Sequence, residues 1–178
     1  MTGVQTCALP IWLARIADEG VTSWNTPKIG NLQPIIAQRL ASLGILNDPQ
    51  AVAVVQKQLQ SCLNSQRGQW LLQPHAQAKS EWQLAGNIEG NIVHATIDRS
   101  FVDEAGVRWI VDYKTAAPTT GEDMQQFLAT QQQQYESQMH QYAVLVSRLD
   151  NVHIATKIML ALYFPSVDGW QQWAFIEL

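Results

Sequence analysis

The residues best suited to chemistry lie in the stretch "IDRSFVDEAGVRWIVDYKT", residues 97 to 115, which carries Asp98, Asp112 and Lys114. The stretch is otherwise largely apolar and typical of two β-strands joined by a turn. Two carboxylates converging beside an ammonium group could hold a hard divalent cation and a scissile phosphate. The simpler interpretation is a solvated strand face with an ordinary ion pair, so the direction of each side chain decides between the two.

The turn between the aspartates sets those directions. A three-residue loop, Glu104 to Gly106 with Gly106 in the left-handed conformation, is a common hairpin connection. It makes Asp103 and Val107 the closing pair and places Asp98 opposite Asp112. The same register pairs Phe101 with Trp109, Arg99 with Val111, Ile97 with Tyr113 and Thr96 with Lys114.

A four-residue loop is the competing register, and it would place Asp98 opposite Val111 and separate the carboxylates. The three-residue loop is favoured because it alone gathers the apolar and aromatic side chains on one face. Facing carboxylates destabilise a sheet unless something neutralises them. His94 shares the face of Asp98 but lies roughly 13 Å away at strand rise, too far to share a metal with it.

The surrounding elements predict an α/β (α+β) fold, a mixed sheet with flanking helices. Asp48 is expected to cap a helix whose first residue is Pro49. The turn between the first two strands is expected within "NIEGN", and the last hairpin around "SVDG". The predicted helices cover 12–19, 34–44, 48–65 and 122–149, and the predicted strands 80–86, 92–102 and 107–115, followed by strands in 153–164 and 170–178.

Composition bounds the function further. The 178 residues are 47% hydrophobic and 15% charged, as expected for one globular domain without a membrane span. The net charge of −4 argues against a domain that binds nucleic acid by itself through a basic surface. It does not argue against a nuclease site, which is acidic without its metal. Only Cys7 and Cys62 are present, which excludes a four-cysteine iron–sulfur cluster and favours a reduced, cytoplasmic setting.

The pattern "TIDRSF…RWIVDYKT", followed by a helix with "YESQMHQY", resembles the PD-(D/E)XK nuclease domain at the C-terminus of UvrD-like helicase-nucleases, the AddA and RecB group. The resemblance extends to "RGQWLLQPHAQAKSEWQL" and "LALYFPSVDGWQQW", so it covers most of the chain. It implies a restriction-endonuclease-like core. It also implies a site built from Asp98, Asp112 and Lys114, with Gln138 and Tyr142 positioning DNA or supporting the site.

The resemblance further implies a Mg²⁺-dependent deoxyribonuclease of the exonuclease type, acting in DNA double-strand-break repair and recombination. Mn²⁺ is a possible substitute, and the backbone carbonyl of Tyr113 is implied as a further metal ligand beside Asp98 and Asp112. Glu81 matches a glutamate of close relatives, although a structural role such as pairing with Arg99 or Lys79 stays open. The implied partners are DNA, helicase domains upstream in the same polypeptide and a second helicase-nuclease subunit.

Residues 1–11, "MTGVQTCALPI", resemble a translated sequencing adapter, so residues 12–178 are expected to be a C-terminal nuclease domain fragment. The family supplies a metal-binding histidine just before "WLARIADEG", and this sequence has none there. The chain is therefore expected to be folded but weakly active. The alternatives are a catalytically inactive, nuclease-like scaffold that binds DNA or a partner subunit, or a phage or restriction enzyme of the same Asp-x-Lys type.

Overall fold

The computed structural model describes residues 8–149 and 157–176, which divide into two compact units. We call them the helical unit and the sheet unit. The helical unit holds the described residues up to Pro74, together with Tyr113–Ala117 and Phe164–Gly169. The sheet unit holds the described residues of His75–Asp112, Pro118–Tyr163 and those from Trp170 onward.

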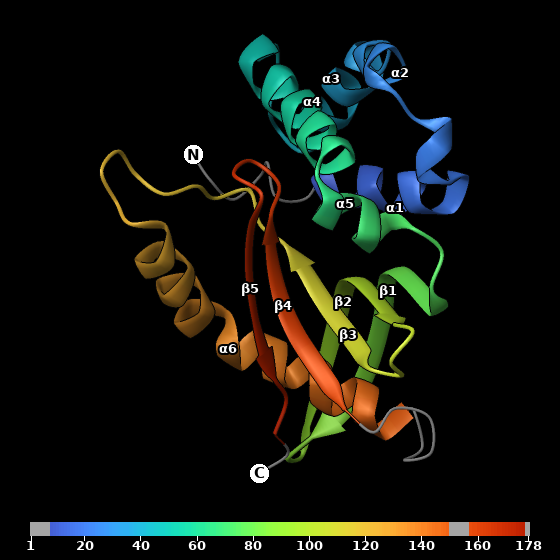
Figure 1. The fold of residues 1–178 in the computed structure, drawn as a ribbon, viewed down its shortest axis with the longest axis vertical. Coiled ribbons are helices and arrows are strands. Elements are labelled where there is room, and N and C mark those ends of the chain that lie inside the picture. Colours follow the sequence, from blue (N-terminus) through green and yellow to red (C-terminus); the bar gives the residue numbers. More distant parts are fainter. Residues whose placement is uncertain (1–7, 150–156, 177–178) are drawn as a thin grey trace. The chain divides into compact units, whose positions relative to one another are not determined.

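The helical unit begins with five α-helices and one short 3-10 helix (Figure 1). They are α1 (Leu9–Glu19), η2 (Val21–Ser23), α2 (Thr26–Gly30), α3 (Gln33–Ser42), α4 (Pro49–Asn64) and α5 (Gln66–Leu72). The helices predicted near 12–19, 34–44 and 48–65 are confirmed as α1, α3 and α4. Helix α1 starts at Leu9, inside the segment that resembles an adapter, and both Ala8 and Leu9 are fully buried.

Side-chain caps explain where two of these helices begin. Asp48 accepts hydrogen bonds from the backbone N–H groups of Gln50 and Ala51, each 2.9 Å long, which confirms it as the N-cap of α4. Ser65 ends α4 and caps α5, because its Oγ accepts a 3.0 Å hydrogen bond from the Gly68 amide. A Cβ at Gly68 would lie 2.7 Å from the Sγ of Cys62 and closer still to its carbonyl oxygen. The turn from α4 into α5 therefore requires glycine there.

The sheet has five strands in the order β1-β2-β3-β4-β5. They span Ala76–Ile88 (β1), Asn91–Val102 (β2), Arg108–Tyr113 (β3), Ile158–Phe164 (β4) and Gly169–Ala174 (β5). Strands β1 to β3 are antiparallel neighbours. The Arg108 amide donates to the Lys157 carbonyl at 2.9 Å, so β3 and β4 begin side by side. Helix α6 connects the end of β3 to the start of β4. The two strands therefore run in the same direction, and the sheet is mixed, as predicted.

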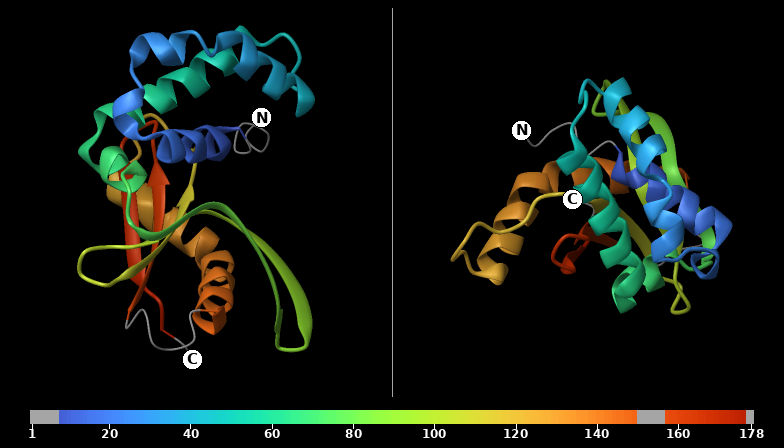
Figure 2. Two further views of the ribbon diagram at one scale, coloured as in Figure 1. Left: turned by 90° about the vertical axis from the view of Figure 1, so that its right-hand side faces the viewer. Right: turned by 90° about the horizontal axis from the view of Figure 1, so that it is seen from above.

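That connecting helix is α6, Met124–Leu149, and it lies alongside the sheet (Figures 1 and 2). Asp123 starts it by accepting hydrogen bonds from the Gln125 and Gln126 amides at 3.0 Å. Residues at helical spacing form an apolar stripe on it, which is buried at Met139, Tyr142 and Val146 and half-buried at Tyr135. Leu145 packs over β1 so closely that a Cβ at Gly86 would lie 2.6 Å from its Cδ2.

Strand β3 is buried on both of its faces, from Arg108 to Tyr113. This differs from a hairpin with one apolar and one solvated face. The Arg108 guanidinium, 2% exposed, donates to the backbone carbonyl and the side-chain oxygen of Gln77. Gln77 has a φ of 50° and lies in the irregular register between Ala76 and Lys79. A buried arginine thus holds the start of β1 against β3, an arrangement that strand alternation does not predict.

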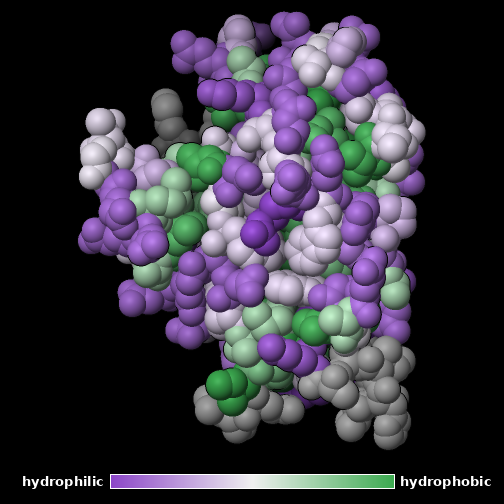
Figure 3. Space-filling view, viewed as in Figure 1, coloured by the Kyte–Doolittle hydropathy of each residue, from purple (hydrophilic) through white to green (hydrophobic). Residues whose placement is uncertain are grey.

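The face seen in Figure 3 shows hydrophobic side chains in small groups between hydrophilic ones. The large apolar side chains that are exposed among the described residues are Ile35, Leu46, Val54, Ile92, Leu149 and Ile176. Within residues 8–149 and 157–176, none of the helices is long and apolar enough to cross a bilayer.

Candidate active site

The turn that orders the candidate site is the predicted three-residue loop. The Asp103 amide donates to the Val107 carbonyl at 3.0 Å, and the Gly106 amide donates to the Asp103 carbonyl at 3.0 Å. Gly106 has a φ of 78°, the left-handed conformation that the loop requires. Asp103 and Val107 are therefore the closing pair, and the four-residue alternative is wrong.

The Asp103 side chain stabilises this turn. Its Oδ1 accepts 2.9 Å hydrogen bonds from the Ala105 and Val107 amides, and its Oδ2 accepts one of 2.8 Å from Trp109 Nε1. Burial opposes the charged carboxylate, but these hydrogen bonds outweigh burial, and the pKa of Asp103 is lowered. The hydrogen bonds of the hairpin thus favour the charged form of Asp103.

The register that follows brings the two predicted aspartates to the same point of the hairpin. Strand β2 pairs with β3 from Val102–Arg108 to Arg99–Val111, including the predicted pair Phe101–Trp109. Asp98 and Asp112 are the next residue on each strand beyond Arg99 and Val111. Continuing the register by one residue sets their carboxylates opposite each other, on one face.

Burial argues against an ordinary solvated ion pair. Asp112 is 5% exposed, Lys114 is 7% exposed, and Asp98 is half-buried. Charged groups are seldom buried unless they are paired or bind a metal. Lys114 follows Asp112 by two residues, and Tyr113 and Lys114 belong to the helical unit. The chain itself thus keeps Lys114 near Asp112.

Helix α6 adds Gln138 and Tyr142, one helical turn apart as predicted. Gln138 Nε2 donates a 2.6 Å hydrogen bond to Tyr142 Oη. Burial, followed by the charges of Asp112 and Asp98, raises the pKa of Tyr142 to about 12, although the hydrogen bond from Gln138 acts in the opposite direction. Gln138 and Tyr142 are thus in direct contact, and the Tyr142 hydroxyl lies within electrostatic range of both carboxylates.

Glu81 lies in the same row of the sheet. It falls between the Ser80–Arg99 and Trp82–Ile97 pairs, which sets it across from Asp98. It is half-buried and has a φ of 48°, an uncommon backbone conformation for a non-glycine residue. The Arg99 guanidinium, one possible partner, donates to Ser80 Oγ at 2.9 Å. Strands β1, β2 and β3 each contribute one carboxylate at matching positions.

The carboxylates of β2 and β3 suit a magnesium ion in number and type. Mg²⁺ usually keeps several waters and is bound through one or two carboxylates plus substrate phosphates. The described residues contain no group of three or more His, Cys, Asp or Glu side chains that could enclose a metal. Two carboxylates on adjacent strands would leave most coordination positions of such an ion to water or phosphate oxygens.

Ser100 is a residue near the site that the sequence analysis missed. It is fully buried, two residues from Asp98 on the same strand, so it faces the same way. Its Oγ has no hydrogen-bond partner among the described residues. The spacing of two from Asp98 is the signal that could have identified it.

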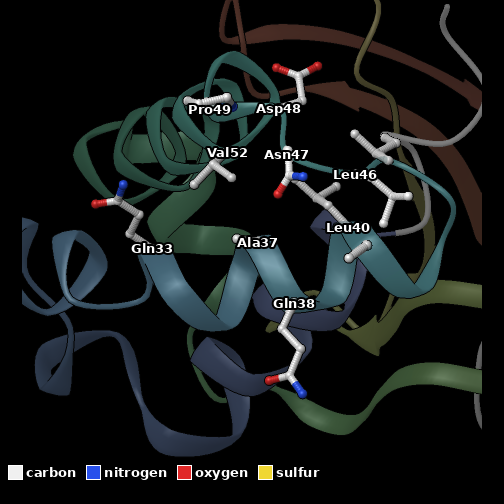
Figure 4. Close-up of a pocket in the computed structure, with 11 residues that line it drawn as sticks. Gln33, Ala37, Gln38, Leu40, Leu46, Asn47, Asp48, Pro49 and Val52 are labelled. Atoms are coloured by element: carbon white, nitrogen blue, oxygen red, sulfur yellow. The ribbon is translucent and has the colours of Figure 1, made fainter.

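Two cavities of the helical unit contain none of this chemistry. One pocket of about 390 Å³ is lined by α3, the start of α4 and the segment between them, including Leu40, Asn47 and Val52 (Figure 4). Its one ionisable residue, Asp48, is the cap of α4. A second pocket of about 380 Å³ lies beside Trp24, Gln60 and Gln69. Neither pocket is lined by a predicted site residue.

No protein-family model matches this chain, and a search of curated proteins found no relative.

Proposed function

We propose that this chain is a metal-dependent DNA nuclease domain of the PD-(D/E)XK type, derived from a helicase-nuclease, which hydrolyses phosphodiester bonds. The observation that carries the proposal is the hairpin register, which leads Asp98 on β2 and Asp112 on β3 to adjoining positions one residue beyond the Arg99–Val111 pair. The charges of both aspartates also raise the pKa of Tyr142 on α6, which supports including that residue in the site.

In this proposal Asp98, Asp112 and the backbone carbonyl of Tyr113 hold Mg²⁺, or Mn²⁺ in its place. When bound, such an ion lowers the pKa of a water molecule and neutralises charge on the phosphate. The two aspartates provide hard oxygen ligands from neighbouring strands, whose positions are fixed by the Asp103 turn. Rigid strands favour a precise ligand geometry.

Lys114 supplies the ammonium group of the site. It is buried and follows Asp112 by two residues, and its proposed role is to orient the attacking water or to stabilise negative charge that develops on the phosphate. An ammonium offers three donors and no acceptor, so it complements phosphate oxygens.

Tyr142 and Gln138 position the substrate. Because Tyr142 Oη accepts from Gln138, its own proton stays available for another acceptor. The raised pKa keeps the hydroxyl protonated at neutral pH. A neutral O–H donor fixed beside two carboxylates can bind a phosphate oxygen without adding negative charge.

The proposal is tested with end-labelled linear DNA and Mg²⁺. Wild-type protein should cleave, and Asp112→Asn should reduce the rate by at least ~100-fold, the upper end of the cost of losing a supporting residue at a metal site. Asp18→Asn, an exposed carboxylate on α1, is the matched control and should leave the rate unchanged. Cleavage by Asp112→Asn at the wild-type rate would refute the proposal. DNA binding without cleavage by the wild type would instead favour the inactive scaffold.

A further inference from the structure

Strands β1 and β2 continue beyond β3 as a two-stranded ribbon. Strand β3 pairs with β2 only over Arg99–Val102, whereas β1 stays paired with β2 as far as Ile88 and Asn91. The ribbon closes through Glu89 and Gly90, whose φ values of 51° and 85° fit a type I′ turn. Figure 2 shows this ribbon, in green, reaching away from the other strands.

One face of the ribbon is open to solvent. Exposure alternates along β2, because His94 and Thr96 are exposed whereas Ala95 and Ile97 are buried. The register places Thr96 opposite Gln83, which is also exposed. We call this surface the ribbon face and define it by Lys79, Glu81, Gln83, His94, Thr96 and Asp98. Because residues two apart share a face, it leads directly to the carboxylates of the candidate site.

The charges on the ribbon face follow a simple order. Glu81 and Asp98 are in the middle, since both fall between the Ser80–Arg99 and Trp82–Ile97 pairs. Lys79, exposed, pairs with Ser100 and is about 7 Å from the row of Asp98 at strand rise. His94 lies on the other side of that row, roughly 13 Å away. Two nitrogen donors therefore flank the carboxylates along the strand direction.

A linear polyanion fits this arrangement of nitrogen donors and carboxylates along the strands better than a small ligand does. One phosphate at the carboxylate row would need the metal, and the phosphates on either side would reach Lys79 and His94. Gln83 and Thr96 lie between as uncharged hydrogen-bonding groups. An open strand face gives an extended chain room to lie along it, whereas small ligands are usually enclosed in concave pockets.

We propose that the ribbon face is the track for the nucleic-acid strand, which runs along β1 and β2 with Lys79 and His94 contacting phosphates on opposite sides of the scissile one. This inference rests on the proposed nuclease function and adds the path of the substrate. It gives roles to two residues that are too far from the metal position to act in the chemistry.

The test measures the affinity for a fluorescein-labelled single-stranded oligonucleotide by fluorescence anisotropy, with Ca²⁺ in place of Mg²⁺, over a range of salt concentrations. Lys79→Gln should weaken binding several-fold and reduce the slope of log K against log salt by about 0.7, the value for one lost contact to a single strand. His94→Gln should also weaken binding. Lys57→Gln, an exposed lysine on α4, should change neither the affinity nor the slope.

Wild-type affinity and slope in both Lys79→Gln and His94→Gln would overturn the proposed track, as would the absence of measurable binding by the wild type. The cleavage assay separates this failure from a failure of the nuclease proposal. If Asp112→Asn loses cleavage while the two ribbon variants bind normally, only the track is wrong. If Asp112→Asn still cleaves, the nuclease assignment itself is wrong.

Discussion

A tyrosine hydroxyl that accepts a hydrogen bond keeps its own proton for a different partner, and Tyr142 is in this situation. Its ring is buried, and the negative charges of Asp112 and Asp98 help to raise its pKa. Deprotonation would place a third negative charge beside Asp98 and Asp112. The protonation of Tyr142 therefore reports the charge of the candidate site.

Replacing either aspartate should lower the pKa of Tyr142 from about 12 toward the ordinary tyrosine value. Asp112→Asn should have the larger effect, because the charge of Asp112 raises this pKa more than that of Asp98 does. The measurement is a titration by tyrosinate absorption, with Tyr142→Phe subtracted to remove the other three tyrosines. An unchanged Tyr142 pKa in both variants would show that the carboxylates are not near the hydroxyl.

The same shift predicts a loss of stability at high pH. Below pH 10, Tyr142 is protonated in both the folded and the unfolded chain, so its contribution is fully present. Between pH 10 and about 12 the unfolded chain loses the proton first, and the free energy of unfolding falls by up to roughly 3 kcal/mol. In urea titrations across this range, Tyr142→Phe should lose less stability than the wild type. Equal losses would contradict the raised pKa.

At the scale of elements, the β2–β3 hairpin depends on Asp103. Asp103→Ala removes the acceptor for three hydrogen bonds, from two amides and the Trp109 indole. We expect a loss of roughly 1–3 kcal/mol in the free energy of unfolding, measured by urea denaturation. Because the lowered pKa of Asp103 reflects the same bonds, the wild type should lose this contribution as acidification protonates the carboxylate.

The matched control is Glu104→Ala, an exposed residue of the same turn whose change should cost little. An Asp103→Ala variant as stable as Glu104→Ala would mean that the hydrogen bonds do not hold the register.

The hairpin could be predicted because a local rule decides it. A loop of three residues ending in Gly106 fixes which residues of β2 and β3 face each other, as far as the Arg99–Val111 pair that adjoins Asp98 and Asp112. The spacing of Gln138 and Tyr142 likewise follows from the helix repeat. Both predictions needed only residues close in sequence.

Other features depend on segments far apart in the chain. The burial of both faces of β3 and the bond from Arg108 to Gln77 require strands and helices that the local pattern does not specify. Helices α2 and α5 are only 5 and 7 residues long, too short for a clear apolar repeat. Ser100 reads as an ordinary strand residue until its burial is known.

For the whole molecule, charge is the main constraint on the proposed activity. The chain carries a net charge of −4, and DNA binding commonly depends on basic side chains that neutralise phosphates. A divalent ion at the aspartates would offset part of this charge at the one place where phosphate must approach. The remaining affinity is proposed to come from helicase domains and a second subunit, so the chain alone should bind DNA weakly.

Asp98 and Asp112 are proposed to form one site for a divalent cation, and the melting temperature as a function of MgCl₂ at neutral pH tests this proposal. An ion that binds only the folded state stabilises it by about 2.7 kcal/mol at 100 times its Kd. The wild type and Asp18→Asn should show a melting temperature that rises with MgCl₂, whereas Asp98→Asn and Asp112→Asn should show a much smaller rise. A wild type that does not respond, or aspartate variants that respond as strongly as the wild type, would contradict the shared site.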